Sequence, residues 1–279
     1  MQPTPEERVH IFSGRETAAD AGTLADPGSS RCLLDLDVDL AEELDHETRR
    51  VARAAATARI LEVDAGQVPL FDWLRQASSG LGVLVVDGVL AVSVQVIDRV
   101  AAELVGVGEL VQAPSRQEDA LLSCEVGCRA LIPSRVAVLD ESFARRVRFW
   151  PEISAALLRR AAQRAFNLDV QRAITAQPRL EMRLALLLWH LAGRWGKVEI
   201  GGIRLPLPLT HQLLGRLVGA ERPSVSHALT RLASAGLVTG HGDEWHLHER
   251  LRERLPAMGE PLGIHTERIA SAAGAIGLA

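Results

Sequence analysis

The chain has 279 residues, of which 47% are hydrophobic and 4% aromatic, it lacks tyrosine, and its formal net charge is -4. This length suffices for two compact domains with aliphatic cores, and no apolar run approaches the ~20 residues that a membrane-spanning helix needs. The N-terminus lacks the basic and apolar regions of a secretory signal, so we expect a cytoplasmic protein with no membrane partner. Its three cysteines, an odd number, are expected to be reduced.

The first third of the chain predicts an extension, a short helix and then strands. Residues 1–31 are rich in Pro, Gly, Ser, Thr, Ala and acids and predict a flexible extension. A short polar helix is expected over 38–55. An apolar period of two then predicts strands over 58–63, 82–86, 89–96, 121–124, 128–131 and 136–139. Asp87-Gly88 predicts a hairpin turn between two of them, and the run of short antiparallel strands predicts a β-roll or sandwich over 32–140.

Helical spacing returns after Asp140 and predicts a long helix over 141–176. Its apolar stripe is Ile153, Leu157, Ala161, Ala165 and Leu168. Because the stripe is long, built largely of small residues and flanked by arginines, we expect it to pack against a second copy of the chain, in a parallel homodimer. Gln177-Pro178 ends this helix, and a helix over 180–195 and a short hairpin over 197–205 follow.

Residues 209–248 carry the most informative pattern, which predicts two short helices, a tight turn and a β-hairpin. The first helix buries the apolar residues between 213 and 218 and ends at Gly219, where the turn needs a residue that tolerates positive φ. Gly215 is expected where the two helices cross closely. Pro223 lies in the opening turn of the second helix, whose N-terminus is expected to point outward, with Ser224 or the residues before it as a cap. This is the pattern of a winged helix-turn-helix.

Charge supports a nucleic-acid role for this segment. Residues 201–242 contain four arginines (Arg204, Arg216, Arg222 and Arg231) and one acid, Glu221. Positive charge is thus expected to gather where a phosphate backbone would lie.

The pattern LTxxxLGxLVGxxRxSVSxALxxLxxxGLV, which begins at Leu209, resembles the C-terminal domain of the Crp/Fnr superfamily of bacterial transcription regulators. The order of β-roll, long helix and winged domain matches that family's layout over about residues 33–250. The resemblance implies an α+β fold with a cyclic-nucleotide-binding-like antiparallel β-roll at 32–140, a dimerisation helix at 141–176, a winged helix-turn-helix at 177–250 and a tail at 251–279. It implies a homodimer on a pseudo-palindromic operator, with double-stranded DNA, a second copy and RNA polymerase as partners.

By this resemblance, Arg222, Ser224, Ser226 and His227 fall on the positions that meet DNA in the family. The other candidate DNA contacts in the helix-turn-helix and wing are Thr210, His211, Pro223, Thr230, Arg231 and His241. Family members often have an acid where Pro223 stands and an arginine where His227 stands, so we expect an operator different from the usual one. The alternatives are a plain helix cap for Ser224 and a solvated surface residue for His227.

In nucleotide-binding members of the superfamily, the roll carries a phosphate cassette, and Gly108-Glu109-Leu110 matches its first part. The second part is absent, because Ser123-Cys124-Glu125 stand where an arginine and a hydroxyl are expected. A cyclic phosphate would lose its bidentate partner there, and neither Arg116 nor Arg129 has the expected spacing. We expect an unknown signal other than cyclic AMP. Gly108, Glu109, Leu110, Arg116 and Cys124 remain the candidate effector residues, with a plain β-turn as the favoured alternative for Gly108 and Glu109.

Other chemistry has weaker support. Cys124 and Cys128, four residues apart on different strands or across a turn, could approach each other and be joined by Cys32, but iron-sulfur members need four cysteines and burial is the commoner role of small thiols. His246 and His248 share a strand face with His241 nearby, yet surface histidines are favoured over a metal site. We expect no cofactor, no metal and no enzymatic activity, since no catalytic motif is present. The alternative function is a ligand- or redox-sensing protein whose winged helix mainly contacts another protein.

Overall fold

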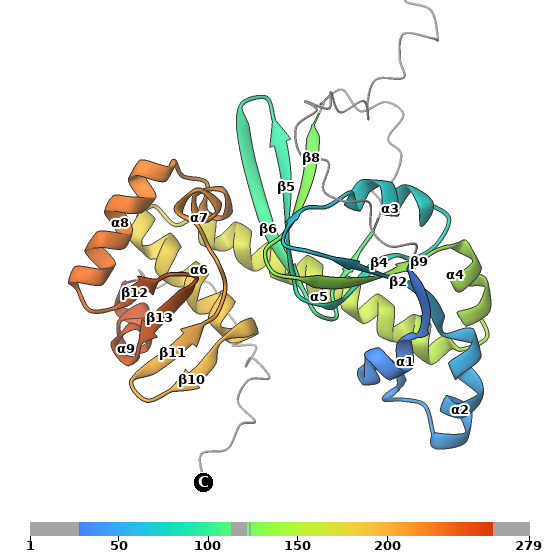
Figure 1. Ribbon diagram of the computed structural model, residues 1–279. Coiled ribbons are helices and arrows are strands. Elements are labelled where there is room, and N and C mark those ends of the chain that lie inside the picture. Colours follow the sequence, from blue (N-terminus) through green and yellow to red (C-terminus); the bar gives the residue numbers. More distant parts are fainter. Residues whose placement is uncertain (1–27, 113–121, 123, 259–279) are drawn as a thin grey trace, which may run out of the picture. The chain divides into compact units, whose positions relative to one another are not determined.

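The structure is a computed structural model that describes residues 28–112, 122 and 124–258 (Figure 1). The chain divides into two compact units, residues 1–170 and 171–279, which are described separately. No helix in the described ranges is long and apolar enough to cross a membrane.

The first unit contains two antiparallel sheets, which confirms the predicted N-terminal roll (Figure 1). The five-stranded sheet has the order β1-β2-β9-β4-β7 and the four-stranded sheet the order β3-β8-β5-β6. The strands are β1 (Ser29–Cys32), β2 (Thr57–Val63), β3 (Gly66–Gln67), β4 (Gly82–Asp87), β5 (Val89–Val96), β6 (Arg99–Gly106), β7 (Leu110–Val111), β8 (Glu125–Ala130) and β9 (Ser134–Leu139).

Short helices and the start of a long one complete this unit. They are α1 (Leu33–Leu36), the 3-10 helix η2 (Val38–Ala41), α2 (His46–Ala55), α3 (Leu70–Gln76), α4 (Glu141–Val147) and α5 (Pro151–Thr175). Side chains begin two of them: Asp45 accepts from the amides of Glu47 and Thr48, and Asp140 accepts from the amide of Phe143. Such caps satisfy amides that have no partner inside the helix.

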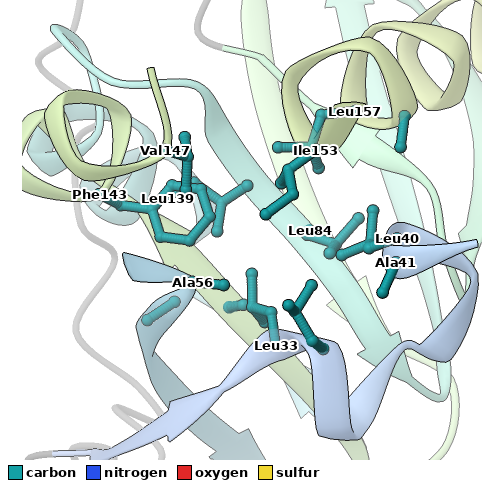
Figure 2. Close-up of a cluster of buried hydrophobic side chains, with 14 of the residues drawn as sticks. Leu33, Leu40, Ala41, Ala56, Leu84, Leu139, Phe143, Val147, Ile153 and Leu157 are labelled. Atoms are coloured by element: carbon teal, nitrogen blue, oxygen red, sulfur yellow. The ribbon is translucent and has the colours of Figure 1, made fainter. Parts of the chain in front are cut away.

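Both faces of strands β4 and β9 of the five-stranded sheet are buried, whereas the edge strand β1 is largely exposed. Leu84 and Leu139 face a cluster that includes Leu33, Phe143 and Ile153, contributed by helices α1, α4 and α5 (Figure 2). The alternate residues of β4 and β9, such as Val83 and Val138, face a second cluster shared with the other sheet. Two-sided burial explains why these strands read as continuous apolar runs.

The predicted hairpin at Asp87-Gly88 is wrong. Strand β4 pairs with β7 and β9, whereas β5 pairs with β6 and β8, so the chain passes from one sheet to the other at Gly88. Gly88 has φ +90, and an added Cβ would lie 2.1 Å from the Ser134 hydroxyl. The hairpin is formed instead by β5 and β6, the latter a strand that the sequence analysis missed, and its turn holds Ile97 at φ 57.

Other boundaries also shift. Strand β1, paired with β2, begins at Ser29, so residues 29–31 belong to the roll rather than to the expected extension, and residues 1–27 lie outside the described ranges. The expected helix over 38–55 is split into η2 and α2, and helix α3 was not expected. Leu122 and Cys124 lie outside any strand, while Leu121 and Ser123 are not described. The long helix is interrupted before Pro151, which begins α5.

The expectation that the whole apolar stripe of α5 packs against a second copy is wrong for its first half. Ile153 and Leu157 are buried in the unit's own cluster, whereas Ala165 is exposed. A neighbouring face carries exposed apolar side chains, since Leu158 is 70% and Phe166 48% exposed.

The second unit is a winged helix-turn-helix, as predicted. Its elements are α6 (Leu180–Trp195), β10 (Lys197–Glu199), β11 (Gly202–Leu205), α7 (His211–Val218), α8 (Arg222–Ser234), β12 (Val238–His241), β13 (Glu244–His248) and α9 (Glu249–Met258). The sheet order is β10-β11-β13-β12, and α6 contacts α7, α8 and α9 (Figure 1). The chain after residue 250 therefore continues as helix α9 to residue 258, where a tail was expected.

Candidate nucleic-acid interface

The turn between α7 and α8 depends on two glycines. The hydroxyl of Thr210 accepts from the amide of Leu213 and begins α7, and Gly219 ends it in the left-handed conformation, with φ 67. A Cβ at Gly215 would lie 2.4 Å from the carbonyl oxygen of Ala220. A side chain at 215 would therefore collide with the backbone of the turn between α7 and α8, whereas the nearest atom of α8 itself, in Val225, would lie at an ordinary contact distance of 3.7 Å. Gly215 is thus needed for the tight turn rather than for the close helix crossing that was predicted.

Helix α8 buries one face and exposes the other. Val225, Ala228, Leu229 and Leu232 are buried. The exposed residues include Arg222, Pro223, Ser224, His227, Thr230 and Arg231. The leading turn of α8 is thus open along its outer face, and backbone amides of a helix N-terminus attract anions such as phosphate.

The cap expected at the start of α8 is absent. Glu221 is the N-cap residue and makes no side-chain cap hydrogen bond, while Pro223 lies at the start of the helix, as predicted. Ser224 falls inside the first turn of α8, so the plain-cap alternative for Ser224 is wrong.

The Ser226 hydroxyl is hydrogen-bonded to other residues of the second unit. Its hydroxyl donates to the carbonyl oxygen of Arg222, 3.1 Å away, and lies 2.8 Å from Nδ1 of His211. The hydroxyl of Thr230 donates to the carbonyl oxygen of Ser226 at 3.0 Å. The contact between His211 and Ser226 therefore joins α7 to α8, whereas the other two bonds lie within α8.

Acidic residues from outside the 201–242 segment neutralise part of its positive charge. Arg204 pairs with Glu199 and with Glu244, and these bonds raise the pKa of Arg204. Arg231 pairs with Glu181 at the start of α6. The basic surface expected from the four arginines is therefore smaller than their number indicates, and it concentrates on the exposed Arg216 and Arg222.

The wing is the hairpin of β12 and β13, which turns at Gly242 and Asp243. His241 is exposed beside that turn. Gly240 lies in β12 opposite Trp245, and a Cβ at Gly240 would lie 3.1 Å from the indole ring, so the buried Trp245 occupies the space over this glycine.

The wing histidines form ring and hydrogen-bond contacts. The rings of His241 and His246 lie 6.3 Å apart, edge to face, and Nε2 of His248 lies 3.3 Å from the hydroxyl of Thr239. No group of three or more His, Cys, Asp or Glu side chains within 28–112, 122 and 124–258 is placed to hold a metal ion.

In the first unit, Glu109 is committed to internal bonds. It is only 7% exposed, its Oε2 accepts from the amide of Gly106 at 2.7 Å, and its Oε1 accepts from the side-chain amide of Asn167 at 2.7 Å. Gly108 forms a turn with φ 79, and the Arg160 guanidinium fills the space beside it, 1.8 Å from where a Cβ would stand. Leu110 begins β7, and Arg116 lies outside the described residues.

Arg160 is itself held by acids. It lies 2.8 Å from Asp37 and 3.6 Å from Asp39. Burial raises the pKa of Asp37, and the positive charge of Arg160 partly offsets this rise. One turn further along α5, Arg164 pairs with Glu103 of β6. Helix α5 is therefore tied to the roll by ion pairs around the turn that was a candidate effector site.

The cysteines are not arranged for a disulfide between 124 and 128. Cys128 is buried in β8, and Cys124 immediately precedes that same strand rather than lying on a different one. Extended backbone separates their Cα atoms by about 13 Å, well beyond the ~7 Å that a disulfide allows. Burial raises the pKa of the Cys128 thiol to about 12, which removes the thiolate that redox chemistry needs.

Sequence reasoning missed the residues that act across elements. The partners Asn167 and Arg160 of the Gly108 turn, the acid Glu181 beside Arg231, and the ring of Trp245 next to His211 are all distant in sequence from what they contact. No local pattern could reveal these contacts, because each depends on how helices and strands pack.

Comparisons with known proteins agree with this geometry. Residues 182–256 match the family model of the Crp-like helix-turn-helix domain. The chain is 36% identical over 92 residues to the CRP-like cAMP-activated global transcriptional regulator of Mycobacterium tuberculosis, in strains CDC 1551 / Oshkosh and ATCC 25618 / H37Rv. That match covers 33% of this chain and spans 41% of the length of these relatives.

Solved structures share the fold over both units. A mutant of CooA from Carboxydothermus hydrogenoformans has a TM-score of 0.58 at 17% identity, covering 84% of this chain and 97% of that one. A CRP-family transcriptional regulator from Thermus thermophilus has a TM-score of 0.53 at 16% identity, covering 70% and 96%. The matches confirm the resemblance to the Crp/Fnr superfamily: residues 182–256 form a Crp-like helix-turn-helix domain, in a chain with the fold of CRP/FNR transcriptional regulators.

Proposed function

We propose that the chain is a sequence-specific DNA-binding transcription regulator. The observation that carries this proposal is the outer face of the leading turn of α8, where Arg222, Pro223, Ser224 and His227 are exposed while the opposite face is buried. In a helix-turn-helix this end enters the major groove. The Crp-like domain at 182–256 supports the same role.

Each exposed residue of α8 has a distinct proposed role. Arg222 can donate two hydrogen bonds to a guanine edge or bind a phosphate, and His227 can contact a base one turn further along. Ser224 and Thr230 suit phosphate oxygens, and Arg231 a phosphate once its pairing with Glu181 is loosened. In the wing, His241 is proposed to lie along the flanking backbone. Thr210 contributes by beginning α7, and Pro223 by shaping the first turn of α8.

We propose that the regulator acts as a parallel homodimer through α5. The exposed apolar residues Leu158, Ala162, Ala165 and Phe166 recur at spacings of three and four and form a stripe on this helix. Exposed side chains as large as Leu158 and Phe166 are costly in water and are removed from it in a helix pair. Two copies would present two α8 helices about 34 Å apart, which suits a pseudo-palindromic site. RNA polymerase is a further proposed partner.

We propose that the N-terminal unit responds to a signal other than cyclic AMP, although the matching Mycobacterium tuberculosis regulator is described as cAMP-activated. The supporting observation is that both side-chain oxygens of Glu109 already accept hydrogen bonds and that Arg160 fills the space beside Gly108. Calorimetry with cyclic AMP and cyclic GMP should detect no binding heat. Saturable binding of either nucleotide would contradict this part of the proposal.

The DNA-binding proposal is tested by selecting duplexes from a random-sequence library at low ionic strength and then measuring affinity for the selected site. We expect R222A to lose about 1–3 kcal/mol of specific binding, whereas R50A, an exposed arginine of α2 in the first unit, should bind like the parent protein. The affinity should also fall steeply as salt increases, because cations leave the phosphates on binding. Failure to select any duplex would overturn the proposal, and a flat salt dependence would favour a winged helix that contacts protein.

A further inference from the structure

The imidazole of His211 lies between the recognition helix α8 and the wing. His211 is the first residue of α7, and its Nδ1 lies 2.8 Å from the hydroxyl oxygen of Ser226 in α8. The His211 ring also lies 6.3 Å from the ring of Trp245 in β13, tilted by 44°. One side chain of α7 therefore contacts both of the elements that are proposed to meet DNA.

The Ser226 hydroxyl has a single proton, and two acceptors lie within its reach: the carbonyl oxygen of Arg222 at 3.1 Å and Nδ1 of His211 at 2.8 Å. We assign the proton to the bond with Arg222, so that Ser226 accepts from a proton on Nδ1 of His211; in the opposite tautomer Nδ1 accepts from Ser226 instead. This bond fixes the turn of α8 that carries Arg222 at one end and Ser226 at the other.

Contacts continue from Trp245 into the wing. Trp245 is 7% exposed, and its indole covers Gly240 of the neighbouring strand, with ring atoms 3.1 to 3.3 Å from where a Cβ would be. Gly240, Trp245, His211 and Ser226 thus form a continuous series of contacts from β12 to the recognition helix. We call these four residues the wing-to-helix series.

We propose that His211 is a positioning residue, which holds α8 and the wing in the arrangement that binds DNA rather than binding DNA itself. This inference rests on the proposed DNA-binding function. A site that must engage a groove and the flanking backbone together loses affinity when its two parts move independently, because the competent arrangement is then only a fraction of the population. The effect should be uniform across operator sequences, since His211 would read no base.

Two variants separate the bond from the ring packing. H211F keeps an aromatic ring against Trp245 but removes the Nδ1 donor, whereas H211N keeps a side-chain amide donor near the Nδ1 position. S226A and the H211F/S226A double variant complete a double-mutant cycle. H46N, at an exposed histidine in the first turn of α2, is the matched control. Nitrogen-15 NMR of the histidine rings reports which ring nitrogen of His211 carries a proton.

We expect H211F to bind the selected duplex about three- to tenfold more weakly, which is the range of one hydrogen bond. The base preference at each operator position should be unchanged, H211N should recover most of the loss, and the double variant should be no weaker than S226A. NMR should find Nδ1 of His211 protonated.

Four results would count against this inference. If the parent protein binds its selected duplex and H211F binds equally well, or if the two substitutions add independently, the positioning role is overturned while DNA binding stands. A changed base preference in H211F would instead make His211 a direct contact and also overturn it. A parent protein that binds no duplex overturns the proposed function and this inference together.

Discussion

The carboxylate of Glu109 accepts a 2.7 Å hydrogen bond from the side-chain amide of Asn167, joining the turn before β7 to helix α5. Glu109 is one of the two buried polar or charged side chains of the described chain, and its other oxygen accepts from the amide of Gly106. A buried carboxylate is stable only when hydrogen bonds replace its hydration. The bond therefore holds α5 against the roll of the same chain.

Replacing Asn167 should destabilise the first unit. N167A removes a hydrogen bond to a buried charge, so we expect the free energy of unfolding to fall by about 1.5–3 kcal/mol. Denaturant titration followed by circular dichroism measures this change. Q163A is the control, because Gln163 is an exposed neighbour whose side-chain amide donates to the Asn167 side chain at 3.2 Å, and its loss should change stability by less than about 0.5 kcal/mol. Equal effects of the two substitutions would contradict the role given to Asn167.

Two glycines of the second unit should respond in opposite directions to alanine. G215A places a Cβ 2.4 Å from the Ala220 carbonyl oxygen, so the turn between α7 and α8 must shift, and stability should fall by about 1–3 kcal/mol. At Gly193 in α6 nothing lies within 4 Å of an added Cβ, so G193A should raise stability by about 0.5–1 kcal/mol through helix propensity. Thermal unfolding of both variants checks this, and stabilisation by G215A would show that the turn does not approach Gly215 as described.

We expect the ion pair between Glu181 and Arg231 to weaken DNA binding, because Glu181 neutralises the charge of Arg231. The Arg231 side chain is 68% exposed, and E181Q removes the acid that neutralises it without removing the side chain. We expect the affinity for a selected duplex to rise about two- to fivefold, in line with the energy of an exposed ion pair. E47Q breaks a comparable pair with Arg50 in α2 and should leave affinity unchanged. A loss of affinity in E181Q would mean that Glu181 positions α8 rather than competing for its charge.

His190 should make the free energy of unfolding depend on pH. Burial, with Arg194 adding to the effect, lowers the pKa of His190 from 6.5 to about 4. The unfolded chain therefore takes up this proton before the folded chain does, so the contribution of His190 is present above pH 6.5 and is lost as the pH falls toward 4. The free energy of unfolding, measured by denaturant titration between these values, should fall less steeply for H190F than for the parent protein. An unchanged slope in H190F, matching that of H46N, would contradict this.

Local chemistry made the helix-turn-helix predictable. Positive φ at Gly219, proline in the first turn of α8 and the periodic apolar residues each act within a few residues, so the sequence pattern contains the geometry. The same reasoning failed at Asp87-Gly88. A glycine with positive φ suits a hairpin and a crossing between sheets equally well, and the pairing of β4 with β7 and β9 was decided by distant strands.

For the candidate sites, the sequence predicted which side chains are exposed, but it did not predict their partners on other strands and helices. Arg222 and His227 are exposed as expected, because the buried positions of α8 fix which faces remain. The partners of Arg204, Ser226 and Glu109 come from other strands and helices. The spacing of residues in the sequence therefore could not predict that the charge of Arg204 is neutralised or that Ser226 and Glu109 are already hydrogen-bonded. A count of charges along the sequence therefore overestimated the basic surface of the winged domain.

The indole of Trp245 takes the volume that a side chain at 240 would need. A larger residue at 240 would therefore require the indole to shift by a few tenths of an ångström, and the same ring is the aromatic neighbour of His211. The exposed turn at Gly242 and Asp243 is free of this packing constraint, since nothing lies within 4 Å of a Cβ added at Gly242.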